Sequence, residues 1–210
     1  PRQHEEDIAV LRERGVHAVF LPAGSSMYPA EYQTYVNVEE VSKPLCGAGR
    51  PGHFRGVCTI VSKLFNIVDP DRDFFGQKDY QQLRVIDQMS RDLNYLVQIV
   101  SGPIVREKDG LAMSSRNSLL TPEHRSQATN IYKTLEFIRQ EYEKGEKLAL
   151  IQEAARKKLS ATPGGRLEYL EFLNPRSLEA IDTSRDGLLA AVAVHFGTVR
   201  LIDNIVLAPR

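Results

Sequence analysis

The stretch RDFFGQKDYQQLRVIDQMSRDLNYLVQIV, Arg72–Val100, decides the fold class. It opens with the short run RDFF and closes with YLVQIV, Tyr95–Val100, and both runs predict strands. Between them, Asp79–Leu93 has apolar residues at helical spacing and predicts a helix. The side chains that we expect to face inward are Leu83, Ile86 and Leu93. A strand, a helix and a strand in this order predict a β-α-β unit with parallel strands, so the first half is an α/β sheet domain.

The residues before this unit predict shorter elements. A helix is expected over Glu5–Arg14, where Ile8 and Leu11 share one face and Gly15 offers a cap. The remaining expectations are strands over HAVFL (17–21) and TYVNV (34–38), a loop rich in Gly and Pro over 43–55, and a helix over 56–68.

After Val105 the pattern changes to helices followed by strands. Thr121 and Pro122 predict a helix start, because threonine caps exposed N–H groups and proline suits the first helical position. The expected elements are helices over 122–144 and 148–159 and strands over 167–173, 187–196 and 198–208, the last two joined as a hairpin at Gly197 and Thr198. This order predicts a smaller α+β domain with an antiparallel sheet. We place the boundary near Arg106, which gives domains 1–106 and 107–210.

The composition narrows the class of protein. The 210 residues include 27 basic and 27 acidic ones, so no overall charge attracts nucleic acid or a membrane surface. No apolar run approaches the ~18 residues of a membrane span, and no signal peptide is recognisable, so we expect a cytoplasmic protein. Cys46 and Cys58 lack metal-site spacing and are interpreted as idle thiols. Because the chain opens on Pro1 without a methionine, we also expect it to be a fragment.

Two stretches, one in the expected loop and one where the next helix begins, have weaker chemical interpretations. GAGRPG, Gly47–Gly52, matches a dinucleotide fingerprint, with an acid at Asp69 or Asp71, but a poor strand precedes it, so a loop is the better interpretation. In HFRG, His53 and Arg55 stand near a helix start that could receive an anion. A histidine satisfied by its neighbours is the alternative.

FFGQKDYQQ lies where the first strand of the β-α-β unit ends and its helix begins, at the sheet edge where open α/β folds bind ligands. Gly76 permits close approach of a ligand to backbone, Lys78 offers a positive charge to phosphate, and Asp79 could cap the helix or contact a ligand. Gln82 lies one turn further along and could reach the same pocket. A simple glycine turn with a capping acid is the alternative.

DGLAMSSRN, Asp109–Asn117, places two hydroxyls beside a guanidinium. Ser114 and Ser115 can donate hydrogen bonds, and Arg116 offers a planar fork to phosphate oxygens. A polar linker between domains is the alternative. Two cationic sites at neighbouring strand ends favour one shared nucleotide pocket. The chain has no Walker-type loop, G-x-S-x-G or H-E-x-x-H motif.

Four segments resemble the pantothenate synthetase (pantoate–beta-alanine ligase) family: RPGHFRGV, FFGQKDYQQL, DGLAMSSRN and RLIDN. The resemblance covers essentially the whole chain and implies a Rossmann-like nucleotidyltransferase domain followed by the α+β domain. It implies a reaction in two steps, in which pantoate and ATP form pantoyl adenylate and pyrophosphate, and beta-alanine then displaces AMP. It also implies Mg²⁺ with the ATP and a homodimer.

The resemblance assigns roles to individual residues. It implies that Lys78 and Arg116 are catalytic and that Gln82 holds pantoate, with no protein ligand to a metal. The implied ATP contacts are Gly76, Gln77, Lys78, Asp79, Val105, Met113, Ser114, Ser115 and Arg116. Position 77 departs from the family, which usually has glutamate there; a backbone contact would survive this change.

A second departure concerns the amino end. The family's segment P-T-M-G-x-L-H-x-G-H, with the histidine credited as proton donor, has no match in these residues. We therefore expect the 210-residue chain alone to bind ATP without making pantothenate. The alternative is a non-catalytic remnant or dimerisation module, and the coding sequence upstream of Pro1 would separate the two hypotheses.

Overall fold

The computed structural model describes residues 4–210 and divides the chain into two compact units, Pro1–Thr34 and Tyr35–Arg210. The first unit contains helix α1 (His4–Glu13) and the short helix α2 (Gly24–Met27), and Gly15 follows α1 with a φ of 73°. The expected strand over 17–21 is wrong. A strand needs a hydrogen-bonded neighbour, and no segment within residues 4–210 pairs with this one.

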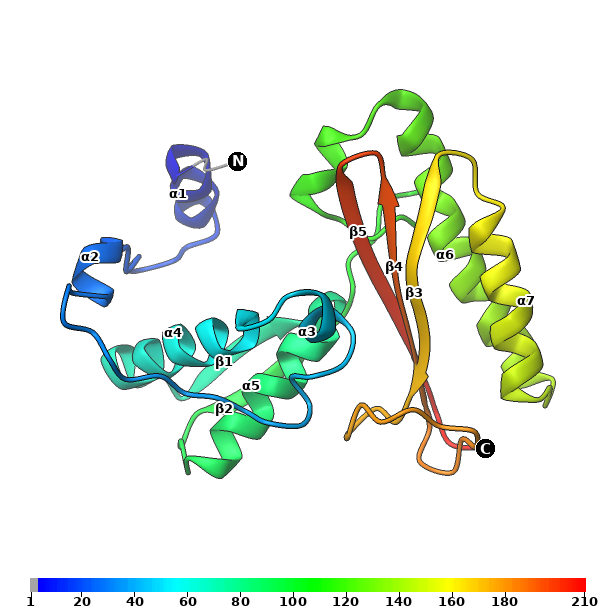
Figure 1. The fold of residues 1–210 in the computed structure, drawn as a ribbon. Helices are drawn as coiled ribbons and strands as arrows, with labels where there is room; N and C mark the ends of the chain where they lie inside the picture. The colour runs from blue at the N-terminus through cyan, green and yellow to red at the C-terminus, as the bar shows by residue number, and fades with distance from the viewer. Residues whose placement is uncertain (1–3) are drawn as a thin grey trace. The chain divides into compact units, whose positions relative to one another are not determined.

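The first part of the second unit contains the predicted β-α-β arrangement (Figure 1). Its elements are α3 (Cys46–Gly49), α4 (His53–Val68), β1 (Arg72–Gly76), the 3-10 turn η1 (Gln77–Asp79), α5 (Tyr80–Asp92) and β2 (Gln98–Gly102). Strands β1 and β2 are parallel, as predicted, with Gly76 opposite Gly102. Their shared carboxyl edge is therefore where the chain enters α5.

The expected strand over 34–38 is wrong as well. The backbone N–H of Val36 donates to the hydroxyl of Thr59 on α4 (3.1 Å), and the guanidinium of Arg55 lies 3.7 Å from the ring centre of Tyr35. Val38 is buried in the core below. Residues 34–38 thus pack along helix α4. The hydroxyl of Thr59 accepts the hydrogen bond that a neighbouring strand would have accepted.

Two details around α5 differ from expectation. Leu83 and Ile86 are buried as predicted, but Leu93 is 48% exposed because it follows the last residue of the helix. Val85 and Met89 take inward positions instead. Strand β2 begins three residues later than expected, at Gln98.

The rest of the unit follows the predicted order. Its elements are the 3-10 turn η2 (Ser115–Leu119), α6 (Pro122–Glu143), α7 (Leu148–Ser160), β3 (Gly165–Leu173), β4 (Leu188–Phe196) and β5 (Val199–Leu207). The hydroxyl of Thr121 accepts from the N–H of His124 (3.2 Å), which confirms the cap. The sheet is antiparallel in the order β3-β4-β5, with the predicted hairpin at Gly197.

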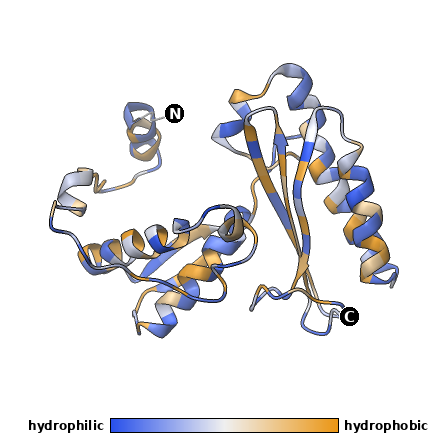
Figure 2. Cartoon of the chain, viewed as in Figure 1, coloured by the Kyte–Doolittle hydropathy of each residue, from blue (hydrophilic) through white to orange (hydrophobic). Residues whose placement is uncertain are grey.

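Strand β4 packs on both of its faces. Helices α6 and α7 cover one face of the sheet (Figure 1), where Leu188, Ala190 and Val192 join their core. Leu189 and Ala191 join the other core, with residues of α4 and α5. Burial on two sides explains why β4 is a continuous apolar run rather than an alternating one (Figure 2). The domain boundary near Arg106 stays a prediction.

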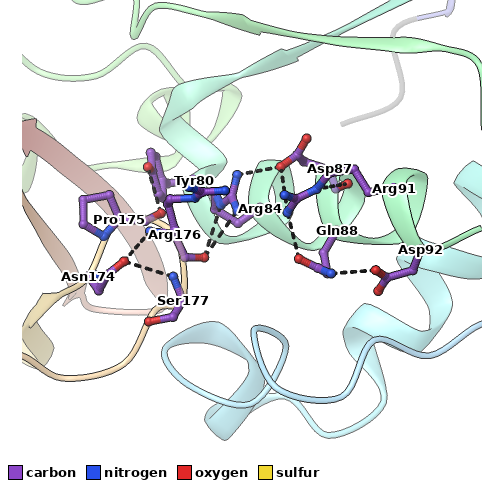
Figure 3. Close-up of polar contacts among 10 residues, drawn as sticks. All are labelled: Tyr80, Arg84, Asp87, Gln88, Arg91, Asp92, Asn174, Pro175, Arg176 and Ser177. Atoms are coloured by element: carbon purple, nitrogen blue, oxygen red, sulfur yellow. Dashed lines mark hydrogen bonds and ion pairs between the residues drawn. The ribbon is translucent and has the colours of Figure 1, made fainter. Parts of the chain in front are cut away.

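The first turns of α5 also contact the loop after β3 (Figure 3). The hydroxyl of Tyr80 donates to the carbonyl of Pro175 (3.1 Å), and Arg84 donates two hydrogen bonds to the carbonyl of Arg176 (3.4 Å each). These contacts fix the start of α5 against the antiparallel sheet. No helix within the described residues is long and apolar enough to cross a membrane.

Candidate active site

A cavity of about 240 Å³ lies where the start of α5, the loop before α4 and strand β5 meet. Four of the residues to which the resemblance assigns a role line it: Lys78, Asp79, Gln82 and Arg116. The two loops predicted to form one pocket therefore do meet. Gly76, Gln77, Val105, Met113, Ser114 and Ser115 are not among the lining residues.

Lys78 is positioned through its backbone. The side-chain amide of Asn204 on β5 donates to the carbonyls of Gln77 and Lys78, each at 3.0 Å. Gln77 thus contributes a backbone carbonyl here, whichever side chain it carries. Asp79 makes no capping hydrogen bond to α5, so its carboxylate remains available at the cavity. The capping alternative is therefore not realised.

The loop with Arg116 is held by local hydrogen bonds. The N–H of Met113 donates to the carbonyl of Val105 (2.9 Å), and the hydroxyl of Ser114 accepts from the N–H of Arg116 (3.2 Å). Ser115 begins η2 and accepts a hydrogen bond from Ser118 through its carbonyl (2.8 Å). The guanidinium of Arg116 makes no hydrogen bond or ion pair with any described residue, so it is available to an anion.

Sequence reasoning missed Arg200, which also lines the cavity. Its Nε and Nη2 atoms donate to the two carboxylate oxygens of Glu168 (2.7 and 3.0 Å), and His195 lies 2.6 Å from the same carboxylate. Arg200 holds the pKa of Glu168 below its usual value, and His195 adds to this effect. Arg200 lies within RLIDN, but only the strand register reveals its partners, since β4 pairs His195 with Arg200.

Glu168→Gln is expected to reduce the free energy of unfolding by about 1–2 kcal/mol at neutral pH, because a half-buried ionic hydrogen-bond pair is lost. A lowered carboxylate pKa contributes stability above the unfolded-state pKa, and this contribution is lost as pH falls through the folded-state pKa. The difference between wild type and Glu168→Gln should therefore shrink below pH 4.5. Urea unfolding from pH 3 to 7 measures it; a constant difference would contradict the assignment.

Arg50 and His53 form a second pair at the cavity. Nη1 of Arg50 lies 3.1 Å from Nε2 of His53. Burial lowers the pKa of His53, and the positive charges of Arg50 and Arg200 lower it further, which favours the neutral imidazole. Arg50, Arg116 and Arg200 also line an adjoining cavity of about 480 Å³. HFRG offered two residues that could bind an anion, His53 and Arg55. Only His53 lines the cavity, because Arg55 packs on the ring of Tyr35.

The glycine-rich loop is positioned by Gln81, a buried residue that sequence reasoning passed over in favour of Gln82. Gln81 accepts from the N–H of Cys46 (3.0 Å) and donates to the carbonyl of Pro44 (2.6 Å). A Cβ at Gly47 would lie 1.7 Å from the carbonyl oxygen of Ser42. The glycine therefore allows two backbone segments to approach, and no strand precedes it as a dinucleotide fold would need.

The comparisons with known proteins agree on one family. The sequence model described as Pantoate-beta-alanine ligase matches residues 1–206. The chain belongs to the pantoate-beta-alanine ligase family. It is 50% identical to the pantothenate synthetase of Geotalea daltonii over 208 residues, which cover 99% of this chain and 74% of that protein.

Solved structures of ligases in this family have the same fold. The pantothenate synthetase of Thermus thermophilus superposes with a TM-score of 0.95 at 43% identity, covering all of this chain and 76% of that one. The pantoate-beta-alanine ligase of Francisella tularensis superposes with a TM-score of 0.77 at 31% identity, covering 98% and 70%. Its structure is described as a complex with beta-gamma ATP and beta-alanine.

Proposed function

We propose that the cavity binds ATP and pantoate and that the protein joins pantoate to beta-alanine through pantoyl adenylate. A carboxylate oxygen of pantoate attacks the α-phosphorus of ATP; a new O–P bond forms, and the bond to the β-phosphate breaks to release pyrophosphate. The amine of beta-alanine then attacks the acyl carbon. A C–N bond forms, the C–O bond to AMP breaks, and the amine loses a proton.

Lys78 and Arg116 are the proposed catalytic residues, and the observation that carries the proposal is that both line one cavity in a chain of this family. Transfer of an adenylyl group needs positioning and stabilisation of negative charge, which two cations at the phosphates supply. Gln82 is the proposed pantoate ligand. Backbone and hydroxyl groups of the two loops are proposed to make the further ATP contacts. The residues that contribute them are Gly76, Gln77, Asp79, Val105, Met113, Ser114 and Ser115.

Magnesium is proposed to accompany ATP. Mg²⁺ is usually held by one or two carboxylates together with substrate phosphates and water. The resemblance assigned no protein ligand to the metal, but Asp79 fits this pattern, because it lines the cavity beside Lys78 without a capping role. Asp203 also lines the cavity, but Arg106 takes both of its oxygens. The ion would neutralise charge on the phosphates.

Pantoate-dependent exchange between ATP and labelled pyrophosphate tests the adenylate route. The assay protein is this chain fused to the amino-terminal segment of the Geotalea daltonii relative, called the fusion protein below. Exchange that requires pantoate but no beta-alanine is the expected result. Release of ADP instead of AMP would refute the proposal.

The 210-residue chain assayed alone is expected to form no measurable pantothenate. The reason is that the family histidine credited as proton donor has no counterpart in these residues, and the aligned region spans 74% of the Geotalea daltonii relative. Conversion of labelled beta-alanine, followed by chromatography, measures this, with the fusion protein as the positive control. Steady product from the chain alone would overturn the expectation.

Three further properties remain proposals: the homodimer, the cytoplasmic location and the two domains split near Arg106. The second candidate function is a non-catalytic dimerisation module.

A further inference from the structure

We propose that Asn204 and Asp203, adjacent on β5, are positioning residues that hold the two cation-bearing loops in register, Asn204 for Lys78 and Asp203 for Arg116. This inference rests on the proposed function, because it assigns the residues that align its two catalytic cations. Both residues are nearly inaccessible, with exposures of 4% and 3%. Buried polar side chains of this kind need partners, and here the partners are the two loops.

Asn204 holds the first loop through both hydrogens of its amide. Nδ2 donates to the carbonyls of Gln77 and Lys78, 3.0 Å from each. Two carbonyl acceptors require the NH₂ group at this position, so asparagine is chemically distinct from aspartate here. The contact acts on the backbone of the turn between β1 and α5. It therefore fixes where the side chain of Lys78 begins.

Asp203 holds the second loop through Arg106. Its two oxygens accept from Nη1 and Nη2 of Arg106 (2.6 and 3.0 Å), and Nη1 also donates to the carbonyl of Gly110 (3.0 Å). Burial raises the pKa of Asp203, and Arg106 opposes this rise. A bidentate pair of this type gives geometric specificity as well as energy.

Contacts inside the second loop transmit this anchor to Arg116. Arg106 and Ala112 form an antiparallel bridge, and the N–H of Glu107 donates to the carbonyl of Leu111 (2.8 Å). Asn117 then donates to the carbonyl of Ala112 (3.1 Å), directly after Arg116. The N–H of Asn204 also donates to Asp203 Oδ1 (2.8 Å), so the two anchors are linked on β5.

The first test measures the loops of the 210-residue chain without ATP. In Asn204→Asp, carboxylate oxygens would face two carbonyls, so amide hydrogen exchange at residues 76–80 should rise about tenfold or more. Asp203→Asn should raise exchange mainly at residues 107–117. Tyr142→Phe is the control, because it removes a buried hydrogen bond to the carbonyl of Ala208 (2.7 Å) far from both loops. Unchanged exchange at 76–80 in Asn204→Asp, or an equal rise in the control, would overturn the proposal.

The second test separates positioning from general destabilisation. ATP affinity is measured by calorimetry for wild type, Asn204→Asp, Lys78→Ala and the double variant. If Asn204 acts through Lys78, Asn204→Asp should weaken ATP binding about tenfold in wild type but less than about twofold in Lys78→Ala. An equal loss in both backgrounds would overturn the positioning role. The wild-type chain could bind no ATP while amide hydrogen exchange at residues 76–80 is still raised in Asn204→Asp. That result would refute only the proposed ATP site and would support the anchoring of the loop by Asn204.

Discussion

Alanine in place of Lys78 or Arg116 is expected to lower pantoate-dependent ATP–pyrophosphate exchange by about 100- to 1000-fold in the fusion protein. Removing one group that stabilises charge in the transition state commonly costs ~2.7–4 kcal/mol of barrier, which corresponds to this range. Both cations line the cavity, and neither side chain donates a hydrogen bond to a described residue. Their removal should therefore change the reaction more than the stability of the fold.

The measurement is the initial exchange rate at saturating ATP and pantoate, together with the thermal midpoint of each variant. Lys133→Ala is the matched control, since Lys133 is an exposed lysine on α6. It should exchange at the wild-type rate. Rates within about threefold of wild type for both Lys78→Ala and Arg116→Ala would remove these residues from the catalytic assignment.

Gly110→Ala is expected to lower the free energy of unfolding by about 2–5 kcal/mol. Gly110 has a φ of 89°, where an alanine is strained by about 1–2 kcal/mol, and a Cβ there would lie 1.9 Å from Cδ1 of Tyr132. Overpacking of this kind adds about 1–3 kcal/mol. The substitution also disturbs the segment that Arg106 anchors, so the Arg116 loop should loosen with it.

Urea unfolding followed by circular dichroism measures the loss. Gly56→Ala is the control, because that glycine lies in α4 with open space around its Cβ position and should change stability by less than about 1 kcal/mol. Gly110→Ala should cost less in a Tyr132→Ala background, because the ring that the new Cβ would meet is gone. The same cost in both backgrounds would contradict the clash.

Elements that depend on local patterns could be predicted from the sequence. The amphipathic helices over α4, α5, α6 and α7 and the hairpin of β4 and β5 agree with the structure, because spacing, caps and turn residues lie within each segment. The segment 34–38 could not be placed, because its alternating apolar and polar residues suit either a strand or an extended segment that packs against a helix. Thr59, more than 20 residues away in sequence, decides between them.

The candidate site shows the same limit. Lys78, Asp79, Gln82 and Arg116 can be found from the sequence because their motifs follow strands that end at one sheet edge. The group around Arg200 required the register of three strands, because Glu168, His195 and Arg200 come from β3, β4 and β5. Gln81 and Asn204 act on distant backbone carbonyls, and no local motif indicates such partners.

Strand β4 has a consequence for how residues 35–210 melt. Its even-numbered residues belong to one core, and Leu189 and Ala191 belong to the other, so both cores depend on the same strand, Leu188–Phe196. Unfolding of either layer would expose apolar surface of the other. The free energy of the two layers is therefore coupled, and this unit should lose its structure cooperatively, without a stable half-folded state.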